Sequence, residues 1–252
     1  MTPERKAKLT QTLDWRQPDL TLITDQVHKP RNIAALIRTC DSVGIPHVHT
    51  VTPKAGYPFK GTTRGSDRWV KTTNHDRCEE AVVQVKAQGM KVYAAHFSDR
   101  AIDYRDVDYT VPCAILMGAE KHGVSDEAAE LADEHILIPM MGMVGSLNVS
   151  TAAGIILVEA QNQRLKAGMY EQCRLDQAEY KDTLFEWSYP DLADYCYKQG
   201  LEYPALDDDL VLADASGWYQ AVREGSAEQR EWNIPQNDQE ILAVQVDEKY
   251  SS

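Results

Sequence analysis

The stretch Ile136–Asn148, with the sequence ILIPMMGMVGSLN, is the part of this chain that most constrains its fold. An apolar run ends in Pro139, a loop of Met and Gly residues without charge follows, and a long helix is expected after Asn148. An ordinary surface loop would carry charge. A loop that is uncharged and rich in backbone groups suits an adenine ring and a methylthio group, whereas a buried crossing segment is the alternative interpretation.

Short apolar runs alternate with helical patterns on the amino-terminal side of this stretch. Strands are predicted at 20–24, 48–52, 91–96, 114–117 and 136–139, and helices around 33–40, at 81–88, at 126–132 and from 149 to 166. Such alternation is typical of an α/β fold, a parallel sheet flanked by helices. Gly168 suits the C-cap of the last helix. Ser150 and Gly154 place two small residues on one side of this helix. They would either admit a close helix or subunit neighbour or form a thin spot against the sheet.

The charge of the chain is unevenly distributed. The net charge is −13, which by itself disfavours a nucleic-acid partner. Residues 1–95, however, hold 15 Lys and Arg against 9 Asp and Glu, whereas residues 169–252 hold 6 against 19. The amino-terminal part is therefore basic, with a net charge of 15 − 9 = +6, and the carboxy-terminal part is acidic, with 6 − 19 = −13.

Length and cysteine spacing predict one substantial domain with an appendage. We expect a helical segment at 1–18, the α/β domain at 19–168, a helical extension at 169–225 and a loose acidic tail at 226–252. The five cysteines lie far apart with no C-x-x-C pair, which favours neither a zinc site nor a disulfide framework. No signal-like or membrane-spanning apolar run is evident, so a cytoplasmic protein is expected.

Two further loops fall where predicted strands end, the place at which open α/β sheets bind ligands. The first is Lys29-Pro30-Arg31-Asn32, followed by Arg38; a capping Asn and a solvated Arg are the alternative interpretation. The second, residues 117–123 (MGAEKHG), places Glu120 between glycines that allow close backbone approach to a ligand. Dinucleotide-binding, P-loop, serine-hydrolase and zinc-protease motifs are absent from the sequence.

The segment from Lys54 to Lys71 mixes basic and aromatic side chains: Lys60, Arg64, Arg68 and Lys71 with Tyr57, Phe59 and Trp69. This mixture fits phosphate contact and base stacking, or a solvated loop around a few aromatic anchors. His47 and His49 alternate on a predicted strand and are interpreted as packing or surface residues.

Taken in order, three motifs resemble those of the SPOUT-class (SpoU/TrmH family) RNA ribose 2′-O-methyltransferases. They are Asn32-x5-Arg38, the run 115–123 (ILMGAEKHG) and Ile136–Pro139 with Leu147-Asn148-Val149-Ser150. Residues 16–20 and 26–30 resemble most the branch that methylates the 2′-hydroxyl of guanosine 18 in tRNA. The likeness covers residues 1–170 well and the rest loosely.

The resemblance implies a carboxy-terminal deep trefoil knot that forms the pocket for S-adenosyl-L-methionine, a homodimer built through the knot region, and no metal. It makes Arg38 the catalytic arginine, with the site shaped by Asn32, Glu120, Ser146 and Asn148. Donor contacts would come from Ala95, Gly118, Ile138 and Leu147. RNA contacts would come from Lys29, Lys60, Arg64, Arg68 and Arg164.

One departure is the acidic extension, because in the resembled family this part is commonly basic and helps to hold tRNA. An enzyme acting on ribosomal RNA or on a base, and a catalytically silent RNA-binding module, are the alternatives. Arg38 would either lose a proton in a desolvated site or stay cationic and clamp a phosphate. Glu120 would be a general base or a structural anchor of its loop.

Overall fold

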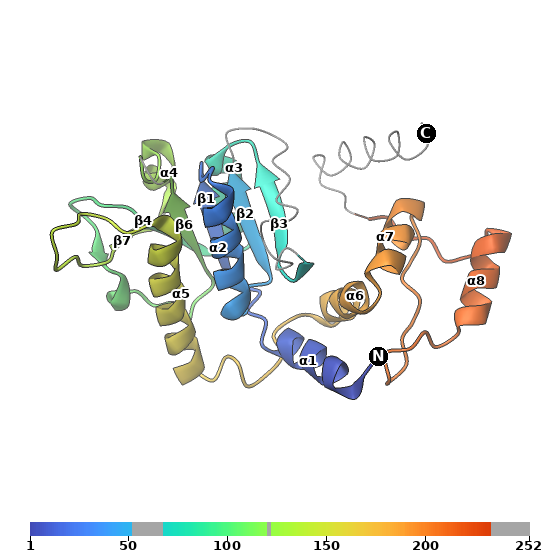
Figure 1. Ribbon diagram of the computed structural model, residues 1–252. Coiled ribbons are helices and arrows are strands. Elements are labelled where there is room, and N and C mark those ends of the chain that lie inside the picture. Colours follow the sequence, from blue (N-terminus) through green and yellow to red (C-terminus); the bar gives the residue numbers. More distant parts are fainter. Residues whose placement is uncertain (52–67, 120–121, 233–252) are drawn as a thin grey trace. The chain divides into compact units, whose positions relative to one another are not determined.

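The computed structural model describes residues 1–51, 68–119 and 122–232, which form two compact units (Figure 1). One unit spans Thr12–Leu175 and contains the sheet. The other combines Met1–Gln11 with the chain from Asp176 onward. The helical amino terminus therefore groups with the carboxy-terminal extension, a pairing that the sequence did not predict.

A seven-stranded sheet in the order β3-β2-β1-β6-β4-β7-β5 organises the first unit. Every neighbouring pair is parallel. The strands are β1 (Leu20–Asp25), β2 (His47–Val51), β3 (Lys71–His75), β4 (Lys91–Ala95), β5 (Ile102–Asp103), β6 (Cys113–Gly118) and β7 (Glu134–Leu137). All residues of β1 and β6 are buried, as expected of central parallel strands covered on both faces.

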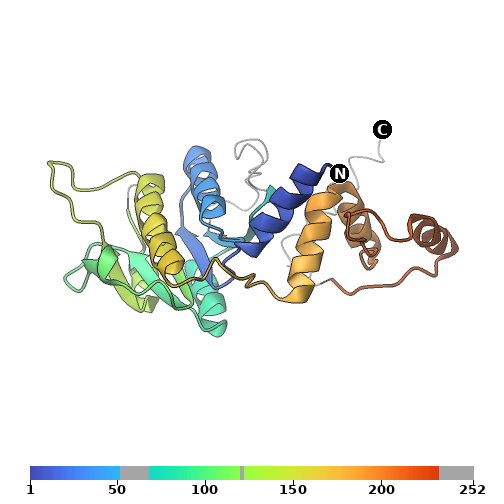
Figure 2. The same ribbon diagram turned by 90° about the horizontal axis from the view of Figure 1, so that it is seen from below.

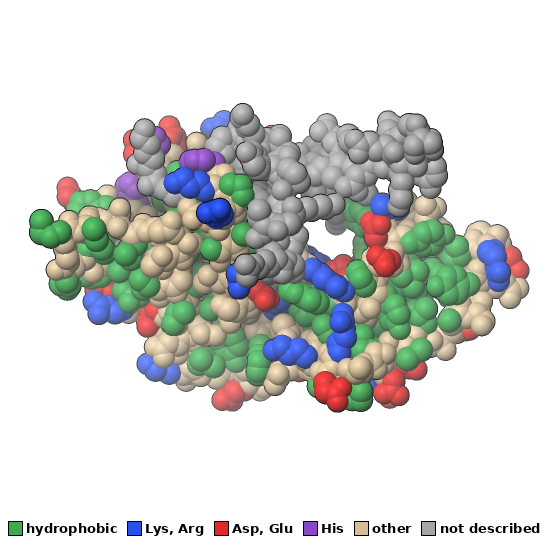
Figure 3. All heavy atoms as spheres, in the orientation of Figure 1, with side chains coloured by type: hydrophobic (Ala, Val, Ile, Leu, Met, Phe, Trp, Pro, Cys, Tyr) green, Lys and Arg blue, Asp and Glu red, His purple; other side chains and the backbone are tan. Residues whose placement is uncertain are grey.

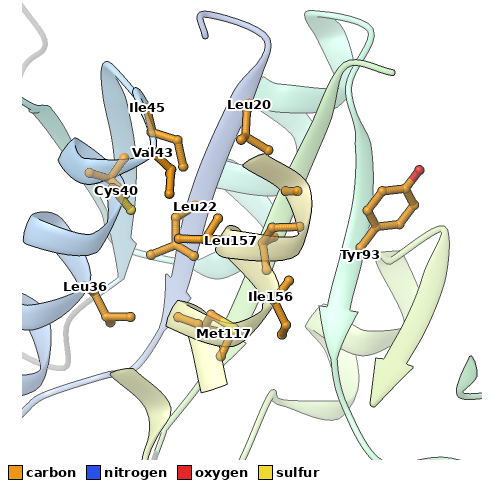
Figure 4. Close-up of a cluster of buried hydrophobic side chains, with 14 of the residues drawn as sticks. Leu20, Leu22, Leu36, Cys40, Val43, Ile45, Tyr93, Met117, Ile156 and Leu157 are labelled. Atoms are coloured by element: carbon orange, nitrogen blue, oxygen red, sulfur yellow. The ribbon is translucent and has the colours of Figure 1, made fainter. Parts of the chain in front are cut away.

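Helices cover both faces of this sheet. On one face lie α2 (Pro30–Ser42) and α5 (Val149–Lys166), which Figure 2 shows side by side and which pack on the largest core. Leu22 on β1 meets Leu36 on α2 and Leu157 on α5 in that core (Figure 4). The other face holds α3 (Cys78–Ala87) and α4 (Asp126–Leu131), with a second core around Ile23 and Leu116. The predicted parallel α/β sheet is confirmed, while the knot stays a prediction.

The second unit is helical. It contains the first residues of α1 (Pro3–Asp14), then α6 (Gln177–Ser188), α7 (Pro190–Gln199) and α8 (Ala215–Glu224). Its small core is formed by Cys196, Leu201 and Ala227. Arg230 then pairs with Asp182 at 2.5 Å and with Glu202 at 3.1 Å. Residues 226–232 are therefore packed rather than loose, and residues 233–252 of the predicted tail lie outside the described residues.

Several predicted boundaries shift. Both β3 and the short β5 were missed because their residues are polar or few, so that Lys71 belongs to a strand and not to a loop. Strand β7 runs from 134 to 137 and stops before Pro139. Gly168 has the left-handed φ of 72° expected just past a helix end. In the described part of the chain, no helix is long and apolar enough to cross a membrane.

Candidate functional site

The carboxyl ends of four neighbouring strands meet at one edge of the sheet. In the parallel register Asp25, the last residue of β1, lies beside Gly118 of β6, and Ala95 of β4 lies beside Ile136 of β7. The predicted catalytic and donor-binding residues that the structure describes end these strands, follow them in the sequence, or lie on α2 and at the start of α5. The edge is thus the place where an open α/β sheet binds its ligand.

Two asparagines join the helices that start at this edge. Asn148 is the N-cap of α5, and its Oδ1 accepts the backbone N–H of Ser150 at 2.9 Å. Its Nδ2 donates to Oδ1 of Asn32, near the start of α2, at 3.3 Å. Residues 116 positions apart are thereby brought together, as the motif prediction requires.

Arg38 lies further along α2 and its side chain is exposed. It is off the buried stripe of this helix, which consists of Ile33, Ala34, Leu36, Ile37 and Cys40. Within the described residues Arg38 makes no hydrogen bond or ion pair, so its guanidinium is available to a phosphate or a ribose. Ser146 is exposed and does not cap α5, because Asn148 does.

The predicted donor contacts are uncharged residues at or after the strand ends. Ala95 and Ile138 are half-buried and pack against the main core, and Leu147 is half-buried. The loop side chains Met141 and Met143 are 92% and 102% exposed, so they lie in solvent. Figure 3 shows apolar side chains at the surface of this loop. Uncharged, partly buried residues of this kind suit the adenosine and thioether parts of S-adenosyl-L-methionine.

Gly118 accepts no side chain. A Cβ built there would overlap the backbone of Gly123 and Val124, because the following loop folds back onto the strand end. Ala119 and Gly123 close this loop with two backbone hydrogen bonds of 2.9 and 2.8 Å. Glu120 lies outside the described residues.

A hydrogen-bonded histidine supports the loop after β4, a feature that the sequence interpretation missed. His135 on β7 is 6% exposed, and its Nδ1 lies 2.7 Å from Oγ of Ser98. Arg100 approaches the other ring nitrogen at 2.6 Å. The loop that follows Ala95 is thereby held on the sheet. The recurring His residues near strand ends were the available sequence signal.

His47, His49 and His75 form a second histidine group on β2 and β3. Nδ1 of His49 lies 3.0 Å from Nε2 of His75. Burial lowers the pKa of His49 to about 3 and that of His47 to about 4. Both imidazoles are neutral at pH 7 and pack in the sheet. Among the described residues, no three His, Cys, Asp or Glu side chains gather as metal ligands would.

The predicted RNA contacts divide into two groups. Lys29 and Arg68 are exposed, and the guanidinium of Arg68 lies 4.9 Å from the ring centre of Trp69. Lys60 and Arg64 lie outside the described residues.

Arg164 requires a correction. Its side chain is 0% exposed and pairs with Asp19 at 2.6 Å. It also donates to Gln17 and to the carbonyl oxygens of Asp19, Tyr109 and Val111. With all its nitrogens engaged inside the protein, this guanidinium anchors α5 to the start of β1 and is not available to RNA.

A cavity of about 810 Å³ lies in the helical unit. Among its charged residues, Arg230 pairs with Asp182 and Glu202. Lys6 likewise bonds the carbonyl oxygen of Asp208. These charges satisfy one another and identify no ligand.

Amide, glycine and uncharged loop residues at the carboxyl edge of a parallel sheet define a ligand-binding α/β protein. Residues 19–158 match the model of the SpoU rRNA Methylase family, and residues 162–209 match that of the SpoU rRNA methylase C-terminal region. The chain belongs to the SpoU methylase family.

Known proteins agree with this assignment. The chain is 47% identical over 222 residues to the tRNA (guanosine(18)-2′-O)-methyltransferase of Escherichia coli K12, covering 86% of this chain and 97% of that protein. A crystal structure of the A. aeolicus TrmH/SpoU tRNA modifying enzyme is similar with a TM-score of 0.70 and 38% identity, over 75% of this chain and 97% of that one. An AdoMet-bound rRNA methyltransferase from Sinorhizobium meliloti is similar with a TM-score of 0.53 and 29% identity, over 61% and 59%.

Proposed function

We propose that this protein transfers the methyl group of S-adenosyl-L-methionine to the ribose 2′-hydroxyl of guanosine 18 in tRNA. The observation that carries the proposal is the contact between Asn32 and Asn148, which joins two separate motifs at the sheet edge. The similarity to the E. coli enzyme extends over 86% of the chain and supports this substrate.

When bound, the donor supplies an electrophilic methyl carbon on a sulfonium. The half-buried Ala95, Ile138 and Leu147 would hold its apolar parts, and the backbone beside Gly118 would read its polar edges. The protein's own task is to hold the ribose hydroxyl in line behind that carbon and to help remove its proton. Positioning supplies much of the rate in such a reaction.

Arg38 is the residue for proton removal or charge stabilisation. A guanidinium rarely loses its proton in a protein, which favours a cation that clamps an RNA phosphate and stabilises the developing alkoxide. Its exposure on α2 suits this contact. Glu120 anchors its loop in this scheme, and a near-normal methylation rate in Glu120→Gln would exclude its use as a base.

Methyl transfer to unmodified tRNA, followed with tritiated donor, tests the proposal. Arg38→Ala should abolish transfer while donor binding, measured by calorimetry, stays within about threefold of wild type. Arg31→Ala is the matched control, because Arg31 is also an exposed arginine on α2. Normal turnover by Arg38→Ala would refute the assigned role, and undiminished 2′-O-methylguanosine in tRNA of a deletion strain would refute the substrate.

We also propose that the protein is a cytoplasmic homodimer. On α5, a Cβ at Gly154 would meet no atom within 4 Å, and Val158 and Leu165 are each 55% exposed. A second copy covering these residues would bury apolar surface that the single chain leaves in water. Sedimentation showing a monomer at micromolar concentration would contradict this assembly.

A further inference from the structure

Asp25 is a buried carboxylate at the centre of the sheet edge. It ends β1, is 2% exposed, and follows the buried Ile23 on the face covered by α3 and α4. Within the described residues it forms no ion pair. Burial of a carboxylate without a cation is costly, so its hydrogen bonds must account for its presence there.

The hydrogen bond of Asp25 reaches the loop that carries Glu120. Its Oδ2 accepts the backbone N–H of Ser125 at 2.8 Å, across 100 residues of sequence. Ser125 is the N-cap of α4, and its own side chain makes no capping hydrogen bond. The carboxylate therefore takes one of the backbone N–H groups at this helix start that would otherwise have no partner.

Three contacts together hold the described ends of this loop, residues 118–119 and 123–125. The Asp25 bond holds its exit at Ser125, the paired hydrogen bonds between Ala119 and Gly123 close it, and its return passes directly over Gly118. Val124, which lies between Gly123 and Ser125 in the sequence, is 2% exposed and belongs to the second core. Loss of the Asp25 bond would free the exit while the closing pair remains.

We propose that Asp25 is a positioning residue of the methyl-transfer site, which sets Gly118 and the returning residues 123–125 against the donor through its hydrogen bond to Ser125. This inference rests on the proposed function, because Gly118 is expected to contact the donor. The group acts through the loop and does not touch the reacting atoms, so its removal should raise the KM for the donor more than it lowers kcat.

Two variants remove the same bond from opposite ends. Asp25→Ala removes the acceptor, and Ser125→Pro removes the donor N–H at a φ of −61° that proline adopts. Each variant should weaken binding of S-adenosyl-L-methionine about tenfold, as measured by calorimetry. The double variant should bind the donor no more weakly than either single variant, because both substitutions act on one hydrogen bond. Asp25→Asn keeps an acceptor oxygen and should stay within about threefold of wild type.

Asp133→Ala is the matched control. Oδ2 of Asp133 accepts the backbone N–H of Val92 at 2.7 Å, at the opposite, amino-terminal edge of the sheet. This substitution should lower the urea midpoint and leave donor affinity unchanged. Equal loss of donor affinity in Asp133→Ala and Asp25→Ala would overturn the proposal, since both would then act through general stability.

Amide hydrogen exchange without donor separates this inference from the proposed function. Asp25→Ala should speed exchange at Ser125 about tenfold or more, relative to amides of β1. Unchanged exchange at Ser125, or unchanged donor affinity in both Asp25→Ala and Ser125→Pro, would overturn the role of Asp25. If exchange at Ser125 is faster in Asp25→Ala but the wild-type protein binds no donor, the hydrogen bond is supported and the methyl-transfer function is refuted.

Discussion

Replacing Arg164 by Met should unfold the protein more easily without weakening its binding to tRNA. The substitution keeps most of the side-chain volume but removes the guanidinium from a site that is 0% exposed. It leaves Asp19 and the carbonyl oxygens of Tyr109 and Val111 without this donor. Breaking a buried ion pair costs about 3–5 kcal/mol.

The expected loss of stability in Arg164→Met lies near the lower end of that range. Asp19 keeps a second cation, because Arg174 contacts its other oxygen at 2.7 Å. A loss of about 3 kcal/mol corresponds to a fall in Tm of about 6–12 °C for a domain of this size. Arg174→Met, whose side chain is 28% exposed, is the control and should cost about 1 kcal/mol or less.

Urea unfolding followed by circular dichroism measures the stability, and filter binding below the transition measures tRNA affinity. Arg164→Met should bind tRNA within about threefold of wild type. A variant with the wild-type urea midpoint and a large loss of tRNA affinity would refute the reasoning, because the guanidinium would then have to reach RNA.

Two further predictions concern buried polar groups. Burial lowers the pKa of His49 to about 3 and that of His47 to about 4. As the pH falls through about 6.5, the unfolded chain therefore binds protons that the folded chain does not. The free energy of unfolding should fall by about 1.4 kcal/mol for each histidine between pH 7.5 and 5.5. Urea midpoints of His49→Gln should fall less over this range, and an equal fall would contradict the assignment. Thr24 is 1% exposed, and among the described residues its Oγ1 has no partner. Thr24→Val should therefore gain about 1 kcal/mol in urea unfolding, and a loss of methyl transfer would instead reveal a use for the hydroxyl.

Much of the sheet could be predicted because its strands are buried on both faces. Cys113–Gly118 is an almost continuous apolar run, Leu20–Asp25 holds three apolar residues, and α2 carries its buried residues on one stripe. Edge strand β3, with the sequence KTTNH, has no such pattern, since only one of its five residues is buried. Pairing with β2 makes it a strand, and this pairing is a long-range event.

Some residues of the candidate site could likewise be identified from the sequence and others could not. Asn32 and Asn148 were identified by their motifs, whereas Arg164 was misassigned because a basic residue late in a helix looks the same in sequence whether it is exposed or buried. The role of Asp25 was not predicted, because its partner is a backbone N–H 100 residues away.

The sequence by itself determined those properties that neighbouring residues carry: the buried strands, the apolar stripe of α2, the uncharged loop and the family motifs. Which polar side chain is enclosed and which faces solvent was decided only by the tertiary structure. The physical reason is that desolvation and hydrogen-bond pairing depend on atoms brought together from distant segments, as in the pairs Arg164–Asp19 and Asp25–Ser125.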